Sequence, residues 1–247
     1  ERLPPNVDSL ETLRQLLARD VFMGWPNTPP DPEVRMVASG GSSGRFLREY
    51  EFTSQTLVPL RVFILGHEGE VPTRVELRVL DESGWRDWLA AGRFEFGQAL
   101  SRYTFSEMAA SGARLPLLAP GSAVVWFCPR GVGPDRWEGD ARKQVQIRRR
   151  FQLLGQTVDG MRVWDVRRAL AVVRGLAPGA TFSVSARGVM ASHVLHAAVF
   201  EENPLQLNLD ALPETYREGP DYLNAGRITD PIRVRGLVRS VHRVGGG

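Results

Sequence analysis

The segment 155–200 constrains the fold of this chain most strongly, because distinct local patterns follow one another within it. A helix-like run over 161–173 carries a Trp-Asp-x-x-Arg pattern and ends at a break that contains Gly and Pro. A short β-like run over 181–185 leads through a tight turn of small residues into a second helix over 192–200, which is rich in Ala and Leu. This alternation predicts a largely parallel sheet with helices on both faces.

Alternating polar and apolar residues predict further strands, which we expect to pair as antiparallel hairpins at one edge of the sheet. The continuous apolar run over 122–129 predicts a strand that is buried in the core of the sheet. Leucines at helical spacing predict a helix over 9–20, and GGSSG at 40–44 is interpreted as a flexible loop. The expected strand regions are 47–65, 73–80, 122–129, 181–185 and 205–209.

Length and composition predict one α/β domain. The chain has 247 residues, of which 43% are hydrophobic and 24% charged, and this suffices for one well-covered core. We expect an N-terminal helix and wrapping segment over 1–46 and the sheet core over 47–247. Because the first residue is Glu1 rather than Met, we also expect a processed chain or a fragment of a longer protein.

Composition also argues against several classes of partner. The single cysteine, Cys128, lies in an apolar run and predicts a buried, inert thiol. No run of about 18 apolar residues is present, so we expect no membrane partner. The net charge is +3, and the one dense basic run, Arg148–Arg150, lies among acidic residues, so we expect ion pairing there and no nucleic-acid binding. The compartment stays open, with export of a longer parent protein as one option.

The sequence LLGQTVDGMRVWDVRRAL at 153–170, together with the small-residue turn after it, resembles α/β-hydrolases of the acetyl xylan esterase and dienelactone hydrolase type. The resemblance runs from the strands near Tyr50 to Asp230. It implies an α/β-hydrolase-like fold with a mostly parallel sheet, helices on both faces and an antiparallel N-terminal edge. We expect this fold to be truncated at its C-terminus, because the elements that carry the catalytic acid and base in the family are mostly missing. The resemblance gives Trp164 and the pair Asp165–Arg168 a structural role.

In that family the turn is the nucleophile elbow, G-x-S-x-G, a strained corner that presents the serine oxygen above the sheet. The matching residues here are Arg187-Gly188-Val189, so the nucleophile position is Gly188, which has no side chain. The resemblance places the oxyanion-binding backbone amides near Arg130 or Gly131 and at Val189. Such donors stabilise an oxyanion but form no acyl-enzyme, which needs an activated oxygen or sulfur.

Two serines flank the elbow and are the fallback nucleophiles. Ser185 lies on the incoming strand and Ser192 on the outgoing helix, where packing or backbone hydrogen bonding is the plainer role. A register shift of a few residues would place either serine at the corner. His242 lies so near the end of the chain that little sequence is left for the strand and loop that normally carry a catalytic histidine.

Ligand-binding candidates are few. His193-x-x-His196 followed by Glu201 lacks the spacing and the number of ligands of a zinc site, so we predict no metal and no cofactor. Trp137 and Tyr216 lie on expected loops and are the best candidates for stacking against a sugar.

Two hypotheses from different classes follow. The first is a catalytically impaired α/β-hydrolase-fold module that supports a catalytic hydrolase domain of the same longer chain or associates with carbohydrate. The alternative is an active carboxylic-ester hydrolase that deacetylates polysaccharide with a relocated nucleophile. The scaffold alone favours the second, and a fold does not establish a function.

Overall fold

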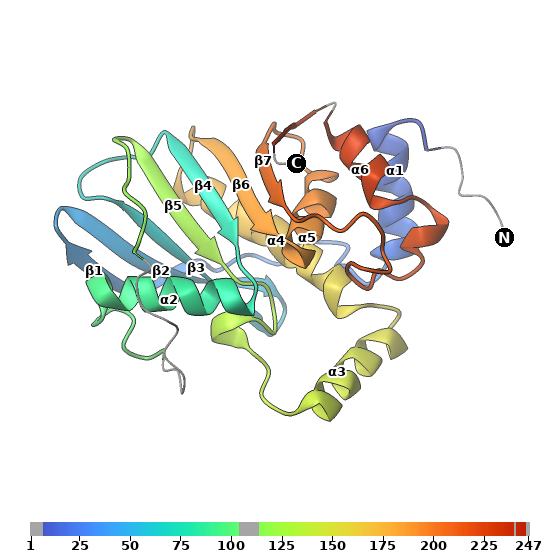
Figure 1. The fold of residues 1–247 in the computed structure, drawn as a ribbon, viewed down its shortest axis with the longest axis horizontal. Helices are drawn as coiled ribbons and strands as arrows, with labels where there is room; N and C mark the ends of the chain where they lie inside the picture. Colours follow the sequence, from blue (N-terminus) through green and yellow to red (C-terminus); the bar gives the residue numbers. More distant parts are fainter. Residues whose placement is uncertain (1–6, 104–113, 240, 246–247) are drawn as a thin grey trace. The chain divides into compact units, whose positions relative to one another are not determined.

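The computed structural model describes residues 7–103, 114–239 and 241–245 (Figure 1). Contacts group the chain into two compact units. Unit 1 comprises 1–29, 137–168 and 184–247, and unit 2 comprises 30–136 and 169–183. Helix α4 (Val158–Leu176) and strand β6 (Thr181–Arg187) each run from one unit into the other. The expectation of a single domain stays a prediction.

Unit 2 contains the antiparallel edge of the sheet, as predicted. Its strands are β1 (Arg35–Ser42), β2 (Arg45–Gln55), β3 (Val58–His67), β4 (Arg74–Val79) and β5 (Ser122–Phe127), in the spatial order β1-β2-β3-β5-β4 (Figure 1). The pairs β1–β2, β2–β3 and β3–β5 are antiparallel, whereas β4–β5 is parallel. The start of β6 follows β4, where the Thr181 amide donates to the Thr73 carbonyl at 2.9 Å.

Two expectations for this unit were wrong. Most of the predicted loop 40–44 belongs to β1, because Gly40, Gly41 and Ser42 pair with β2, which leaves a tight turn at Ser43 and Gly44, both with positive φ. The region 73–80 forms no hairpin, since β4 pairs in parallel with β5 and helix α2 (Glu82–Phe96) supplies part of the crossover that a parallel pair requires.

Helix α2 packs its aromatic side onto the sheet. Asp81 caps the helix by accepting from the Gly84 amide at 2.8 Å. Trp85 and Trp88 are buried, and the Trp88 ring lies 4.6 Å from that of Phe63 and 5.5 Å from that of Trp126. Trp85 and Trp88 therefore form the side of α2 that packs against the sheet.

Cys128 follows β5 and is free and buried. Burial raises the pKa of its thiol well above the ordinary value, so the thiolate required for reactivity does not form at neutral pH. The expectation of a buried thiol is confirmed.

Unit 1 is mainly helical and contains the C-terminal strands. Its remaining elements are α1 (Leu10–Leu16), a π-helical turn (Leu17–Val21), α3 (Ala141–Leu153), α5 (Val189–Ala198), β7 (Gln206–Asp210), a 3-10 turn (Ala225–Arg227), α6 (Pro231–Val238) and β8 (Arg243–Gly245). Side chains of Ser9, Asp140 and Asp230 cap α1, α3 and α6. Strand β7 lies between the end of β6 and the parallel strand β8. The predicted elements over 161–173, 181–185, 192–200 and 205–209 are confirmed, whereas α6 and β8 were not expected.

With its parallel strands and antiparallel N-terminal edge, the sheet is that of an α/β fold. Within the described ranges, no helix has the length and apolar character needed to cross a membrane.

Candidate functional site

The turn between β6 and α5 is a sharp corner formed by Gly188. Its φ of 58° and ψ of −130° lie outside the regions that residues with a side chain adopt readily. The Gly188 amide donates to the Asp210 carbonyl at 2.9 Å, which attaches the corner to the end of β7. A Cβ built on Gly188 meets no atom within 4 Å, so the space beside the corner is open. A strand, a corner residue with positive φ and a helix are the geometry of a nucleophile elbow.

The neighbours of Gly188 contribute no nucleophile at the corner. Arg187 is exposed and its guanidinium lies 3.2 Å from the carboxylate of Asp210. Val189 is the first residue of α5. Ser185 lies within β6. Ser192 lies within α5, where it is 1% exposed and its Oγ has no hydrogen-bond partner in the described part of the chain.

Arg130 and Gly131, proposed from sequence as oxyanion donors, belong to unit 2 and follow β5. Arg130 is buried and its guanidinium donates to Gln55 Oε1 at 3.1 Å. Gly131 has a φ of 71°, so the chain turns sharply there. Their backbone role, like that of Val189, stays a prediction.

A buried polar cluster surrounds His193 in unit 1. His193 is fully buried, and its Nδ1 lies 2.7 Å from the hydroxyl of Tyr222. Its Nε2 lies 3.8 Å from Asp159 Oδ1 and has no hydrogen-bond partner among the described residues. Burial lowers the pKa of His193 to about 3, so the imidazole is neutral at physiological pH.

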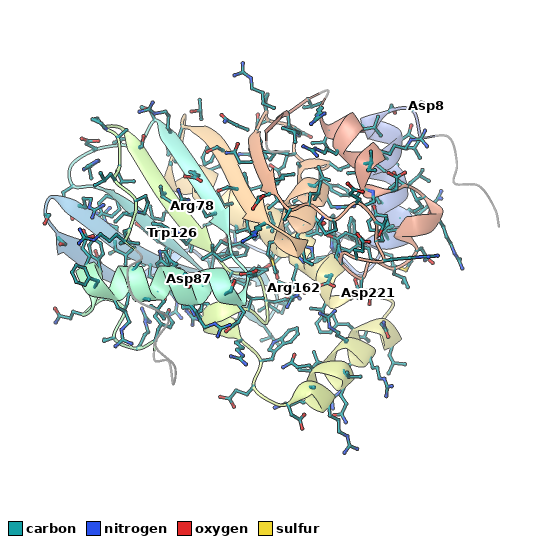
Figure 2. All side chains as sticks on the ribbon, viewed as in Figure 1. Asp8, Arg78, Asp87, Trp126, Arg162 and Asp221 are labelled. Atoms are coloured by element: carbon teal, nitrogen blue, oxygen red, sulfur yellow. The ribbon has the colours of Figure 1, made fainter. Side chains whose placement is uncertain are left out.

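Asp159 joins α4 to two other segments. Its carboxylate accepts from Arg162 at 3.1 Å, from Arg148 of α3 at 3.3 Å and from the Asp221 amide at 3.0 Å; Figure 2 labels Arg162 and Asp221. Burial alone would raise the pKa of Asp159, but His193, the two guanidiniums and the amide outweigh it and lower that pKa. For Arg148, the predicted ion-paired role is confirmed.

His196 is buried further along α5, with its ring 4.7 Å from that of Tyr222. Its Nδ1 lies 2.8 Å from the Ser192 carbonyl and its Nε2 lies 3.0 Å from the hydroxyl of Tyr216. Burial lowers the pKa of His196 to about 4. The two imidazoles bond different tyrosines, His193 to Tyr222 and His196 to Tyr216, rather than converging on one metal ion. No group of His, Cys, Asp and Glu in the described ranges could hold a metal ion.

The two sugar-stacking candidates both make internal contacts. The half-buried ring of Tyr216 lies 5.8 Å from that of His196 and 5.9 Å from that of Tyr222. Trp137 is half-buried, with its ring 6.0 Å from that of Phe151. Trp137 and Tyr216 pack on different rings, and a sugar-binding role for either stays a prediction.

His242 bridges backbone groups of unit 1. It is 3% exposed, its Nδ1 accepts from the Leu205 amide at 3.1 Å, and its Nε2 donates to the Ala198 carbonyl at 2.9 Å. Both ring nitrogens are therefore occupied, and the imidazole holds the end of α5 beside the start of β7.

An aromatic cluster that the sequence did not reveal packs on Trp164. Trp25 lies 5.6 Å from Trp164 and 4.8 Å from Phe200, measured between ring centroids. The Trp25 indole donates to the Gly160 carbonyl at 2.9 Å. The guanidinium of Arg167 lies 5.0 Å from the Trp25 ring, a cation–π distance. Trp164 is 3% exposed, which confirms its core role.

No protein-family model matches the chain, and no curated protein matches its sequence. Solved structures do match. A candidate acetyl xylan esterase from Bacteroides fragilis aligns with a TM-score of 0.65 and 12% identity over 96% of this chain and 67% of that one. Acetyl xylan esterase 1 from Thermoanaerobacterium aligns with a TM-score of 0.53 and 12% identity, over 86% of this chain and 60% of that one. A glucuronoyl esterase from Solibacter usitatus aligns with a TM-score of 0.51 and 8% identity, over 81% of this chain and 57% of that one.

These likenesses identify the fold as that of the α/β-hydrolases. Within that fold, the chain is similar to acetyl xylan esterases, as the sequence had indicated. It spans less than two thirds of the Thermoanaerobacterium and Solibacter esterases.

Proposed function

We propose that this chain is an esterase-related α/β-hydrolase module that does not perform serine-esterase catalysis. One observation carries the proposal: Gly188 occupies the corner between β6 and α5 in an elbow-like backbone conformation and has no side chain. Covalent ester hydrolysis needs an oxygen or sulfur nucleophile at that corner.

The histidines of unit 1 support the same proposal. A general base must reach the proton that it abstracts within hydrogen-bond distance. His193 and His196 are fully buried, and their low pKa values reflect that burial. His242 uses both nitrogens on backbone groups. None of the three is therefore available as an accessible base.

We further propose that the module supports a catalytic hydrolase domain of the same longer chain, or associates with carbohydrate. The fold likeness to an acetyl xylan esterase supports a polysaccharide context.

A serine-reactive fluorophosphonate probe, followed by peptide mapping and a p-nitrophenyl acetate assay, tests the missing catalysis. We expect neither stoichiometric labelling nor turnover above background. Labelling at Ser185 or Ser192 with turnover would overturn the proposal in favour of the active ester hydrolase with a relocated nucleophile. Ser185→Ala and Ser192→Ala then assign the site, and a catalytically intact esterase serves as the positive control.

A further inference from the structure

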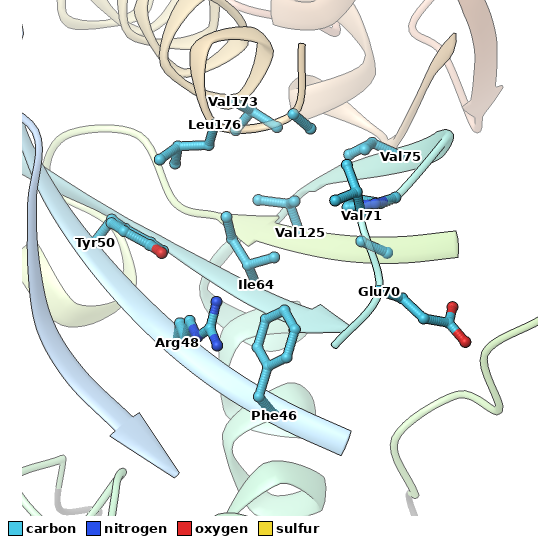
Figure 3. A pocket seen from close by; sticks show the side chains of 13 residues that line it. Phe46, Arg48, Tyr50, Ile64, Glu70, Val71, Val75, Val125, Val173 and Leu176 are labelled. Carbon is cyan, nitrogen blue, oxygen red and sulfur yellow. The ribbon is translucent and has the colours of Figure 1, made fainter. Parts of the chain in front are cut away.

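Unit 2 contains a pocket of about 220 Å³ on the face of the sheet opposite α2. Strands β2, β3, β4 and β5, the loop before β4 and the last turn of α4 line it (Figure 3). Most of its walls are apolar, including Phe46, Ile64, Val125, Val173 and Leu176. All of these residues belong to unit 2. The hydrolase proposal makes no use of this pocket.

The shape of the pocket's apolar floor depends on large and small side chains that alternate between neighbouring strands. Phe46 pairs with Gly66 of β3, and its ring covers that glycine. A Cβ on Gly66 would lie 2.6 Å from Cζ of Phe46, so only glycine allows the ring to lie there. Ala123 of β5 has a short side chain at the pocket floor. An apolar ligand would therefore meet a preformed surface.

One polar group faces this apolar surface without a strong partner. Arg48 stacks over the Phe46 ring at 4.0 Å, and its recorded ion pair with Glu68 is 3.7 Å long, beyond hydrogen-bond distance. The side chains of Arg48 and Glu68 are 37% and 52% exposed, so water screens that pair. Tyr50 lies on the same face of β2, one alternation further along.

The other charged residue of the pocket lining does not compete for the guanidinium. Glu70 accepts from the Gly121 amide at 2.8 Å. Figure 3 shows its carboxylate pointing away from the pocket, while the tips of Arg48 and Tyr50 lie beside Ile64. The pocket thus combines apolar walls with the Tyr50 hydroxyl and with an arginine whose ion pair to Glu68 is long and partly exposed to water.

We propose that this pocket binds a small organic monocarboxylate with an apolar body. The carboxylate meets the Arg48 guanidinium and the Tyr50 hydroxyl, and the apolar body covers Phe46 and Ile64. Charge-assisted bonds between arginine and carboxylate are among the strongest polar contacts in proteins. The volume lies below the roughly 300–1,000 Å³ of sites for drug-sized ligands, which favours a compact aryl or branched acid.

Isothermal titration of the full chain with 3-phenylpropanoate tests the proposal. The neutral 3-phenylpropanamide isolates the charge, and acetate isolates the apolar body. We expect one binding site for the acid, at least roughly tenfold weaker binding of the amide, and no measurable binding of acetate. Equal affinity for acid and amide, or no binding of the acid, would overturn the proposal.

Variants locate the site. Arg48→Gln is expected to remove the preference for the acid. Arg86→Gln is the matched control and should leave it intact, because Arg86 is exposed on α2 and donates to the Glu82 carbonyl. Val71→Asp, at a pocket residue that is 74% exposed, should also weaken acid binding without unfolding the chain. Unchanged binding in both Arg48→Gln and Val71→Asp would place the acid elsewhere. Arg48 and Val71 belong to unit 2, whereas Gly188 belongs to unit 1. Failure of the acid to bind would therefore leave the proposal on esterase catalysis untouched, and the reverse holds as well.

Discussion

His242 and Leu205 are joined by a buried hydrogen bond in which the imidazole Nδ1 accepts from the backbone amide at 3.1 Å. The same ring donates from Nε2 to the Ala198 carbonyl. Both ring nitrogens of His242 are therefore bonded to backbone groups of unit 1.

Replacing His242 with Ala should lower the free energy of unfolding by about 1–3 kcal/mol, because a buried amide and a buried carbonyl lose their partners. Urea unfolding measures the change. Glu202→Gln, at an exposed position, is the control and should leave stability within about 0.5 kcal/mol. A loss no larger than that of the control would show that the bridge contributes little.

Stability should decline as the solution is acidified below pH 6.5. In the folded state the pKa values of His193 and His196 lie at about 3 and about 4, below the ordinary 6.5, because both rings are buried. Unfolding then takes up protons, so their stabilising contribution is complete above about pH 6.5 and is lost as pH falls toward the folded pKa values. Within that window, each histidine should lower the free energy of unfolding by about 1.4 kcal/mol for each pH unit of acidification. Urea unfolding at several pH values measures this slope.

The NMR signals of these two rings provide an independent check. Neither should titrate between pH 5 and pH 8 in the folded chain. A buried ring that titrates near its ordinary pKa would contradict the assigned burial.

Gly188→Ser should fold and remain inactive. The open space beside Gly188 admits the side chain, while the positive φ costs about 1–3 kcal/mol of stability. Without an accessible base the new hydroxyl stays weakly nucleophilic, so p-nitrophenyl acetate turnover should stay at background. Gly226→Ser is the control, since it has equal space and no positive φ. Turnover by Gly188→Ser alone would reveal a base near the corner.

Trp137→Ala should weaken any binding of acetylated xylo-oligosaccharide by more than about 1 kcal/mol. The fold should stay intact, because the ring is only half-buried. Phe94→Ala, which removes an aromatic ring that is 84% exposed, is the matched control. Titration calorimetry compares the affinity of each variant for the oligosaccharide with that of the wild type, and only Trp137→Ala should bind more weakly. Equal affinities for wild type and Trp137→Ala would reject this residue as a sugar platform.

Much of the fold followed from sequence because its parallel core has strong local patterns. The helix over 161–173 buries apolar residues such as Trp164 and Leu170, and Val184 is buried at the centre of the strand over 181–185. Strand β1 lacked such a pattern, because Gly40 and Gly41 have no side chains and their pairing partner β2 supplies the order. The direction of β4 depends on β5, which lies far along the chain.

The candidate site was less accessible to sequence reasoning. The small-residue turn predicted the corner, but spacing alone could not separate Gly188 from Ser185 or Ser192. That distinction rests on backbone angles and on the burial of Ser192. Trp25 lies in a turn-rich segment, and its contact with Trp164 depends on tertiary folding.

None of the side chains of α3 is buried. Its recorded links to other segments of unit 1 include Arg148 to Asp159 at 3.3 Å and Gln152 to Asp221 at 3.4 Å. Polar contacts therefore contribute much of what holds α3 in place, and added salt screens the charged ones. The apolar core of the same unit is instead stabilised by salting-out salts. Ionic strength should therefore loosen α3 under conditions that leave the helices around it firmly packed.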